Sequence, residues 1–197
     1  TGGWGNYVYQ WLRVSDGVVV GNSATVTGLA PGDYRLVITD RNGTGCTIST
    51  PIQTISSPPE IVASASLTDA LCNGSSNGAI DLSVSGGVTP YNYSWSNGAT
   101  TQDISGLAAG TYTVTITDNA GCAISSSFTL GEPASLAINT SVTQVACFGD
   151  ATGVIESNVS GGTAPYSYVW STGATSADIS GLTAGTYDLT VTDANGC

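Results

Sequence analysis

Residues 111–117 read Thr-Tyr-Thr-Val-Thr-Ile-Thr, an unbroken alternation of threonine with a bulkier, less polar side chain. Successive side chains of a β-strand point to opposite faces of a sheet, so this alternation predicts a half-buried strand. Tyr112, Val114 and Ile116 lie on its predicted core face, and the threonines lie on the face toward solvent. The stretch therefore indicates a core built from strands.

Further short strands are predicted around this stretch, separated by turns rich in Gly, Asn and Pro. They are Ala79–Val84, Tyr91–Trp95, Thr101–Ile104 and Cys122–Leu130. No segment shows a sustained helical period of apolar residues. Several strands at spacings of roughly 8 to 12 residues favour an all-β fold, an antiparallel sandwich of the immunoglobulin or PKD kind.

The pattern occurs again 75 positions later, where 27 of 44 residues of the segment 79–122 are identical in the segment 154–197. An earlier partial copy is visible in Leu29-Ala-Pro-Gly-Asp-Tyr34. A fixed period of this kind is typical of tandem repeats. We expect three: residues 1–57 without the first strands, residues 58–132 complete, and residues 133–197 without the last strand. The joints are short, so we expect a rod, and we expect this sequence to be part of a longer polypeptide.

Composition excludes several classes of function. The chain has 197 residues, with 3 Lys+Arg against 14 Asp+Glu and a formal net charge of −11. This charge repels nucleic acid and anionic membranes, and no apolar run is long enough to insert into a membrane. The chain contains no His, which removes Ser-His-Asp and Cys-His catalysis and His-ligated metal sites. We expect no enzymatic activity.

Acidic residues recur once per repeat, as in the pairs Asp103 and Asp178, and Asp118 and Asp193. Recurrence at strand ends favours turn-capping side chains over a catalytic carboxylate pair. A structural calcium ion is the other hypothesis, because calcium accepts carboxylate and amide oxygens. The candidates that a sandwich would bring to one joint are Asp69, Asn73, Glu132, Asp193 and Asn195. No other cofactor is expected.

The aromatic residues have two interpretations. Tyr91, Tyr93 and Trp95 share one strand face and are matched in the next repeat by a set ending in Trp170. They form either a sugar-binding platform or the core, and a buried Trp is expected of such sandwiches, which favours the core. Tyr112 and Tyr187 stand at the entry to a strand, as in a tyrosine corner. Trp4 has no counterpart, so it is the aromatic residue first expected to be exposed or to lie in a frayed end.

The cysteines lie at repeat-locked positions: Cys46, Cys72, Cys122, Cys147 and Cys197. Without His or a Cys-x-x-Cys motif they favour disulfides and an oxidising, extracellular location. Pairing within a repeat would join Cys72 to Cys122, but a nine-residue first strand would separate them by about 30 Å. A bridge requires Cα atoms within about 7 Å. The topology therefore favours a joint disulfide, Cys72 to Cys197. Pairing within repeats and reduced cysteines are the alternatives.

Several motifs together resemble the SprB-type repeat: Pro90-Tyr-Asn-Tyr-Ser-Trp-Ser96, Asp103-Ile-Ser-Gly-Leu107, Ala109-Gly-Thr-Tyr112 and Gly121-Cys122. The resemblance implies a very large protein on the outer surface of a Gram-negative bacterium of the Bacteroidota. The type member of that family is a gliding-motility adhesin exported by the type IX secretion system.

The leading functional hypothesis is a structural and adhesive module, a stalk that makes weak, repeated contacts. Its expected partners are neighbouring repeats and an extracellular polysaccharide or solid surface. One alternative is self-assembly into an extracellular filament through unpaired strands. The other is a carbohydrate-binding accessory module of a secreted enzyme, which an exposed aromatic cluster would favour.

Overall fold

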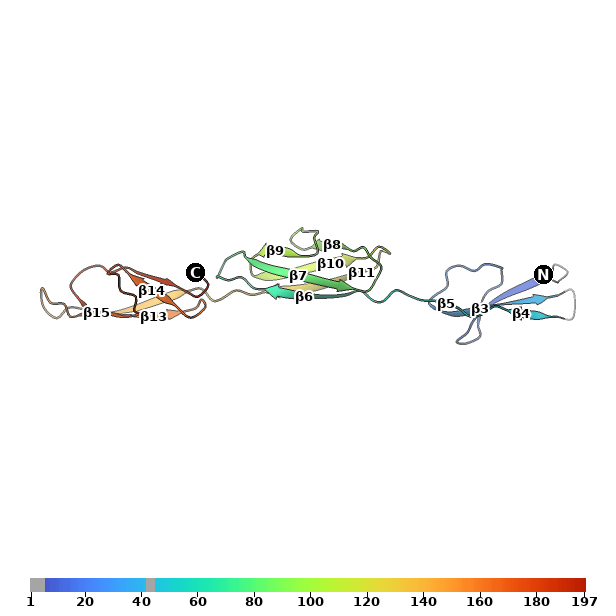
Figure 1. The fold of residues 1–197 in the computed structure, drawn as a ribbon, viewed down its shortest axis with the longest axis horizontal. Coiled ribbons are helices and arrows are strands. Elements are labelled where there is room, and N and C mark those ends of the chain that lie inside the picture. Colours follow the sequence, from blue (N-terminus) through green and yellow to red (C-terminus); the bar gives the residue numbers. More distant parts are fainter. Residues whose placement is uncertain (1–5, 42–44) are drawn as a thin grey trace. The chain divides into compact units, whose positions relative to one another are not determined.

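The computed structural model describes residues 6–41 and 45–197, and every regular element in these ranges is a β-strand (Figure 1). The chain divides into two compact units, Thr1–Pro59 and Glu60–Cys197. All strand pairs are antiparallel. The prediction of an antiparallel all-β fold is thus confirmed. In the described ranges, no helix is long and apolar enough to span a membrane.

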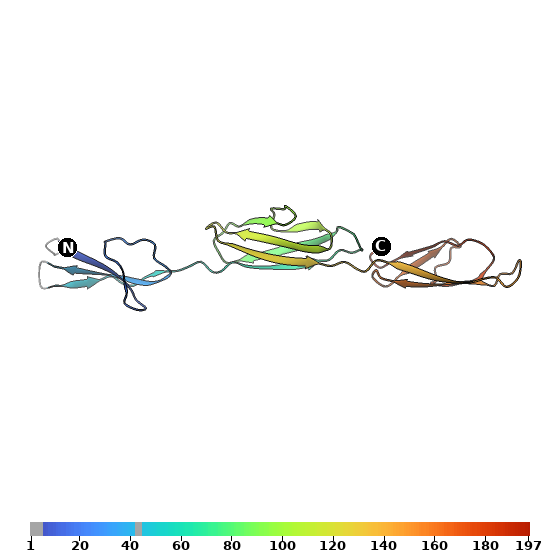
Figure 2. The same ribbon diagram turned by 180° about the vertical axis from the view of Figure 1, so that it is seen from behind.

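Repeat two, at the start of the second unit, is a sandwich of two three-stranded sheets with the orders β6-β7-β9 and β11-β10-β8. Figure 2 shows the sandwich from behind. Its strands are β6 (Val62–Thr68), β7 (Gly78–Ser85), β8 (Asn92–Trp95), β9 (Ile104–Leu107), β10 (Gly110–Thr117) and β11 (Ala123–Leu130). The core lies between the two sheets.

The alternation of threonine with apolar or aromatic residues at 111–117 decides which face of β10 enters that core. Val114 and Ile116 are completely buried, and they pack with Leu82 of β7 and with Trp95. On the other face, hydroxyl groups pair across the two strands: Thr111 with Thr129 at 2.9 Å and Thr113 with Ser127 at 2.8 Å. The period of two residues therefore separates an apolar face from a hydroxyl-bearing face, as predicted.

One predicted strand was wrong by three residues. The strand expected at Thr101–Ile104 is β9, at Ile104–Leu107. Residues before it form a turn instead, because the Thr101 hydroxyl donates to the carbonyl of Asp103 at 2.7 Å. The pairing of β9 with β7 begins only at Ile104, which lies opposite Ile80.

Repeat three has the same strand pattern up to its last strand. Its sheets have the orders β12-β13-β15 and β14-β16. The strands are β12 (Ala137–Thr143), β13 (Gly153–Ser160), β14 (Ser167–Trp170), β15 (Ile179–Leu182) and β16 (Leu189–Thr192). Among the described residues β16 pairs with β14 alone, whereas its equivalent β10 pairs with both β8 and β11.

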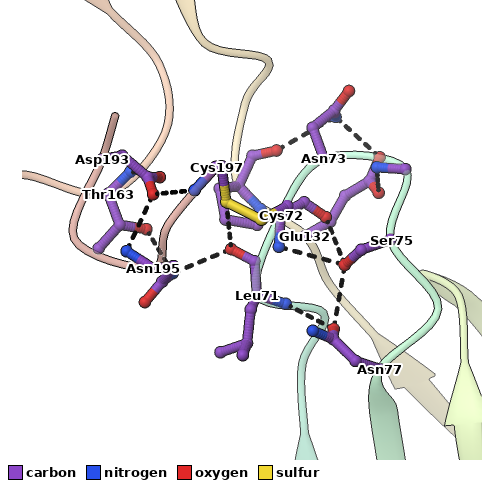
Figure 3. Close-up of a disulfide and its surroundings, with 12 residues drawn as sticks. Leu71, Cys72, Asn73, Ser75, Asn77, Glu132, Thr163, Asp193, Asn195 and Cys197 are labelled. Atoms are coloured by element: carbon purple, nitrogen blue, oxygen red, sulfur yellow. Dashed lines mark hydrogen bonds between the residues drawn. A yellow bond between two sulfur atoms is a disulfide. The ribbon is translucent and has the colours of Figure 1, made fainter. Parts of the chain in front are cut away.

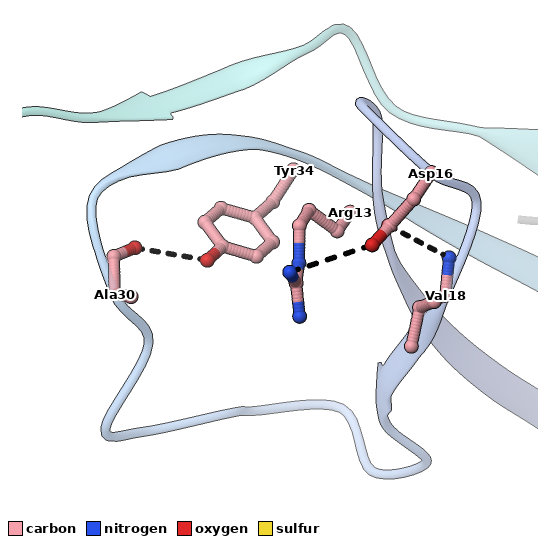
Figure 4. Close-up of polar contacts among 5 residues, drawn as sticks. All are labelled: Arg13, Asp16, Val18, Ala30 and Tyr34. Carbon is pink, nitrogen blue, oxygen red and sulfur yellow. Dashed lines mark hydrogen bonds and ion pairs between the residues drawn. The ribbon is translucent and has the colours of Figure 1, made fainter.

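The first unit holds one sheet, with the order β2-β1-β3-β4 and with β5 also paired to β3. Its strands are β1 (Tyr7–Arg13), β2 (Val19–Gly21), β3 (Gly32–Asp40), β4 (Thr47–Ser49) and β5 (Gln53–Ile55). Figure 4 shows two of its loops: Arg13 pairs with Asp16 at 3.4 Å in the turn between β1 and β2, and the Tyr34 hydroxyl donates to the carbonyl of Ala30 in the loop between β2 and β3.

The buried face of β7 gives a direct test of the sandwich. Changing Leu82 to Ala removes a side chain with no exposed surface, and we expect it to lower the free energy of unfolding by about 2–5 kcal/mol. The matched control is Ser83→Ala on the exposed face of the same strand, for which we expect a change within about 0.5 kcal/mol. Urea unfolding curves measure both. Equal effects of the two substitutions would contradict the assigned faces.

Candidate functional site: the joint between repeats two and three

The joint inside the second unit brings together two turns that are far apart in the sequence (Figure 3). Cys72 lies in the turn between β6 and β7, and Cys197 lies in the turn that follows β16. A disulfide joins them with Cα atoms 5.8 Å apart, across a sequence separation of 125 residues. This is the pair that the topology favoured, and it crosses from one repeat to the next.

A buried carboxylate fixes the position of Cys197. One oxygen of Asp193 accepts the backbone N–H groups of Asn195 and Cys197, each at 2.9 Å, and the other accepts that of Thr163 at 2.8 Å. The equivalent turn of repeat two repeats this arrangement: Asp118 accepts the N–H groups of Ala120 and Cys122 and, with its other oxygen, that of Val88. We call Asp118–Cys122 and Asp193–Cys197 the aspartate turns.

These hydrogen bonds favour the charged carboxylate. The backbone N–H of Val88 is the main cause that lowers the pKa of Asp118, and the N–H of Cys197 is the main cause that lowers the pKa of Asp193. In both cases burial opposes the effect but does not reverse it. Each aspartate turn is therefore held by an ionised side chain.

A second group of hydrogen bonds holds the linker that connects repeats two and three. The carboxylate of Glu132 accepts the side-chain N–H of Asn73 at 3.0 Å and the backbone N–H of Gly74 at 2.6 Å. Asn73 also donates to the carbonyl of Pro133 at 3.2 Å. One residue earlier in the linker, the N–H of Gly131 donates to Asp69 at 2.7 Å. The linker is thus bound along the side of the β6–β7 turn.

The third contact crosses the joint directly. The side-chain amide of Asn195 donates to the carbonyl of Leu71 at 2.9 Å and to the hydroxyl of Thr163 at 3.1 Å. Leu71 directly precedes the bonded Cys72. The disulfide therefore stands beside a hydrogen bond between the same two turns, and the joint is held by both.

Glycine pairs leave room for the linkers. A Cβ atom on Gly161 would lie 2.0 Å from the carbonyl oxygen of Ser135, and one on Gly86 would lie 1.8 Å from that of Glu60. Both glycines have positive φ, at 74° and 79°. From the sequence these glycines are predicted only as turn residues. The repeated Ser-Gly-Gly directly after a strand, 75 positions apart, was the signal that could have revealed the close approach.

The matches to a known family have the same 75-residue offset as the repeats. Two segments match the SprB repeat, residues 64–100 in repeat two and residues 139–175 in repeat three. The chain contains SprB-type repeats. This supports a structural repeat module of a cell-surface protein. A comparison with curated proteins found no match.

Solved structures that resemble the chain consist of immunoglobulin domains. An amphioxus IgVJ-C2 molecule is 17% identical, covers 63% of this chain and 87% of its own, and has a TM-score of 0.30. The DSCAM N-terminal eight-domain structure is 11% identical, covers 84% of this chain and 24% of its own, and has a TM-score of 0.33. At these scores the likeness carries no argument about function.

In the SprB-type repeats the tryptophans belong to the core. Trp95 and Trp170 are buried, and their indole N–H groups donate to the carbonyls of Thr101 and Ser176, each at 2.9 Å. Tyr91 and Tyr93 are half-buried and pack against the same core. This arrangement offers no open aromatic platform on β8. Trp4 lies outside the described residues.

Tyr112 and Tyr187 form the corners that the sequence suggested. Their hydroxyls donate to the carbonyls four residues earlier, of Ala108 at 3.0 Å and Thr183 at 2.9 Å. Tyr34 makes the same bond in the first unit. Each corner fixes the chain near the start of a strand, which is β10, β16 or β3.

Asp103 and Asp178 do not cap local turns, which corrects the sequence-based interpretation. Asp103 accepts the backbone N–H of Leu82 at 2.9 Å, and Asp178 accepts that of Ser157 at 2.8 Å. Both N–H groups lie 21 residues away in sequence, on β7 and β13. The turn before β9 or β15 leaves its carboxylate beside the next strand, so the acid links two strands.

The calcium candidates divide into two hydrogen-bonded groups. Asn73 bonds to Glu132, Asp69 bonds to the linker, and Asp193 and Asn195 belong to the aspartate turn. Within residues 6–41 and 45–197, no three His, Cys, Asp or Glu side chains are grouped to hold a metal ion. A structural calcium ion stays a prediction. The other cysteines, Cys46, Cys122 and Cys147, are exposed.

The lowered pKa of Asp118 predicts an acid-sensitive turn. Because the folded-state pKa lies below the unfolded value near 3.8, the charged carboxylate stabilises the fold above that pH, and this stabilisation is lost as the pH falls through the folded pKa. We expect Asp118→Asn to lower the melting temperature at neutral pH and to flatten its decrease below pH about 4. Asp81→Asn on the exposed face of β7 is the control. If the melting temperatures of Asp118→Asn and of the unchanged protein decrease in parallel as the pH falls, the role of the Asp118 carboxylate in the turn is contradicted.

Removal of the disulfide tests the joint. We expect Cys72→Ser to lower the free energy of unfolding of the second unit by roughly 2–5 kcal/mol, because the bond closes a long loop. Cys147→Ser, at the equivalent exposed position, is the control and should have little effect. The double variant Cys72→Ser with Cys197→Ser should equal either single variant in a double-mutant cycle. Additive losses would show that the two residues do not act as a pair.

Proposed function

We propose that the chain is a stalk segment of a large secreted cell-surface protein, of the gliding-adhesin type, on the outer surface of a Gram-negative bacterium. Export through the type IX system belongs to the same proposal. The two matches to the SprB repeat support a repeat module of a cell-surface protein. The disulfide between Cys72 and Cys197 supports the mechanical role of a stalk. The module binds and positions rather than catalyses.

The mechanism we propose is a limit on extension. With the disulfide closed, tension applied at the two ends of this chain passes from Cys72 directly to Cys197. The residues between the two cysteines, which are 125 positions apart, then carry none of this tension. The stalk keeps its length, and the repeats present their exposed hydroxyl-bearing faces many times along it. Weak contacts with polysaccharide or a solid surface are sufficient in that arrangement, because they act together.

Filament formation is a second candidate, and one observation favours it. The outer strands of the two sheets of repeat two, β6 and β9 in one and β8 and β11 in the other, each pair on one side only within their sheet. An unpaired strand edge accepts an added strand. The accessory carbohydrate-binding module is less favoured, because Trp95 and Trp170 are buried.

Pulling the chain from its two ends by force spectroscopy tests the stalk. Residues extend by at most about 3.6 Å each, so reduction of the bond should add roughly 450 Å to the final length over the 125-residue separation. Cys72→Ser should show the longer extension without reductant, and Cys147→Ser should behave as the unchanged chain. Full extension of the unchanged, unreduced chain would overturn the proposal.

The adhesive part is tested separately on polysaccharide-coated and bare surfaces. We expect the single chain to bind too weakly to be retained, and beads that carry many copies to be retained. Ordered fibres of the purified chain in electron micrographs would support the filament instead. Tight binding of a single chain to one glycan would support the carbohydrate-binding module.

A further inference from the structure

Repeat three carries a second copy of the cysteine-containing turn of the joint. The turn between β12 and β13 is equivalent to the turn that holds Cys72, and it carries Cys147 and Phe148. Cys147 is exposed with its thiol free. Phe148 is fully exposed, at 107% of its reference area, the highest value among the exposed large apolar residues described. A thiol and an aromatic ring therefore lie side by side in the sequence, both in solvent.

The backbone around Cys147 already has the geometry of the bonded turn. The N–H of Asp150 donates to the carbonyl of Cys147 at 3.1 Å, as the N–H of Ser75 does to that of Cys72. The hydroxyl of Thr152 accepts the N–H of Ala146 at 2.9 Å. In the bonded turn the side chain of Asn77 accepts the N–H of Leu71, also at 2.9 Å. The turn is thus formed before any partner is bound.

Five of the seven residues 146–152 differ from their equivalents in 71–77, and the change from Asn73 to Phe148 alters what the turn offers to a linker. Phe148 stands where Asn73 stands in the bonded turn, and Asn73 donates to Glu132 and to the carbonyl of Pro133. A phenyl ring cannot make those bonds. It can pack on a proline ring and on the methylene groups of a glutamate, which removes its apolar surface from water.

We propose that Cys147 and Phe148 form a docking surface for the aspartate turn of a further SprB-type repeat joined in tandem after repeat three, with a disulfide from Cys147 to the cysteine of that turn. The inference rests on the proposed stalk function and extends it to a specific partner. The partner is recognised by the sequence Asp-x-x-Gly-Cys, which both aspartate turns contain. Phe148 covers the incoming linker with an apolar contact in place of the Asn73 hydrogen bonds.

The bond forms by oxidation of two thiols. A small-molecule disulfide such as oxidised glutathione accepts the two electrons and two protons, and it is released as two reduced thiols while the new S–S bond forms. The aspartate of the incoming turn is buried and bound by backbone N–H groups, as Asp193 is, whereas the receiving turn carries Asp150 where the bonded turn has Ser75. Tandem linkage raises the effective concentration of the two cysteines.

The test extends the full chain by a second copy of its own residues 123–197. These residues are one period long, so the added copy continues the repeat in register after Cys197. The extended chain is oxidised in a glutathione buffer, its remaining thiols are alkylated, and its disulfide-linked peptides are mapped by mass spectrometry. We expect two bonds: Cys72 to Cys197, and Cys147 to the added copy of Cys197.

The first bond is an internal control for the second. If Cys72 is bonded to Cys197 while Cys147 is alkylated, the docking proposal is overturned and the proposed stalk function stands. If neither bond forms, the docking proposal and the proposed stalk function both lose their support. A bond from Cys147 to any other cysteine also overturns the docking proposal. Cys122, which has no turn of the β6–β7 kind placed against it in this extended chain, should be alkylated.

Phe148 is tested in the same molecule. We expect Phe148→Ser to lower the equilibrium constant for the Cys147 bond, measured against the glutathione pair, by roughly tenfold. The equilibrium constant for the bond between Cys72 and Cys197 should not change in this variant. Asn73→Ser should lower the constant for the Cys72 bond and leave that for the Cys147 bond unchanged. An unchanged Cys147 bond in Phe148→Ser would remove the aromatic ring from the docking surface.

Discussion

The carboxylate of Asp193 is the contact on which the joint depends. It accepts three backbone N–H groups, and one of them belongs to Cys197 itself. Buried N–H groups without an acceptor are costly, so the turn closes around this side chain. The position of the cysteine follows from the turn, and a disulfide forms only if the two Cα atoms come within a narrow range of distances. An ionised side chain thus determines whether a covalent bond can form.

The bond in turn changes what the repeats can contribute mechanically. Each SprB-type repeat has a small core, and the fully buried side chains are concentrated in repeat two. A core of this size resists unfolding only modestly. A covalent connection between Cys72 and Cys197 does not depend on the core once it has formed. The hydrogen bonds of Glu132 and Asn195 lie beside the disulfide: those of Glu132 hold the linker against the turn that contains Cys72, and that of Asn195 holds the two bonded turns together.

Local sequence patterns predicted much of the fold and the pairing of the cysteines at the joint. The period of two in β10 determined which of its side chains enter the core, and the 75-residue offset related the turns of successive repeats. Strand direction placed Cys72 near Cys197 rather than near Cys122. The roles of Asp103 and Glu132 were not predictable in the same way, because their acceptor oxygens bind groups 21 and 58 residues away. Spacing along a chain does not determine such contacts.

Residues 26–29 show why a motif is not sufficient. They read Val-Thr-Gly-Leu, close to the Ile-Ser-Gly-Leu of β9, yet they form no strand. In repeat two the Ile-Ser-Gly-Leu residues of β9 are paired with β7. The indole N–H of Trp11 is buried there without a hydrogen-bond partner, whereas that of Trp95 donates to Thr101. The same four-residue pattern thus has different conformations in different surroundings, and in repeat two its backbone groups are satisfied by β7.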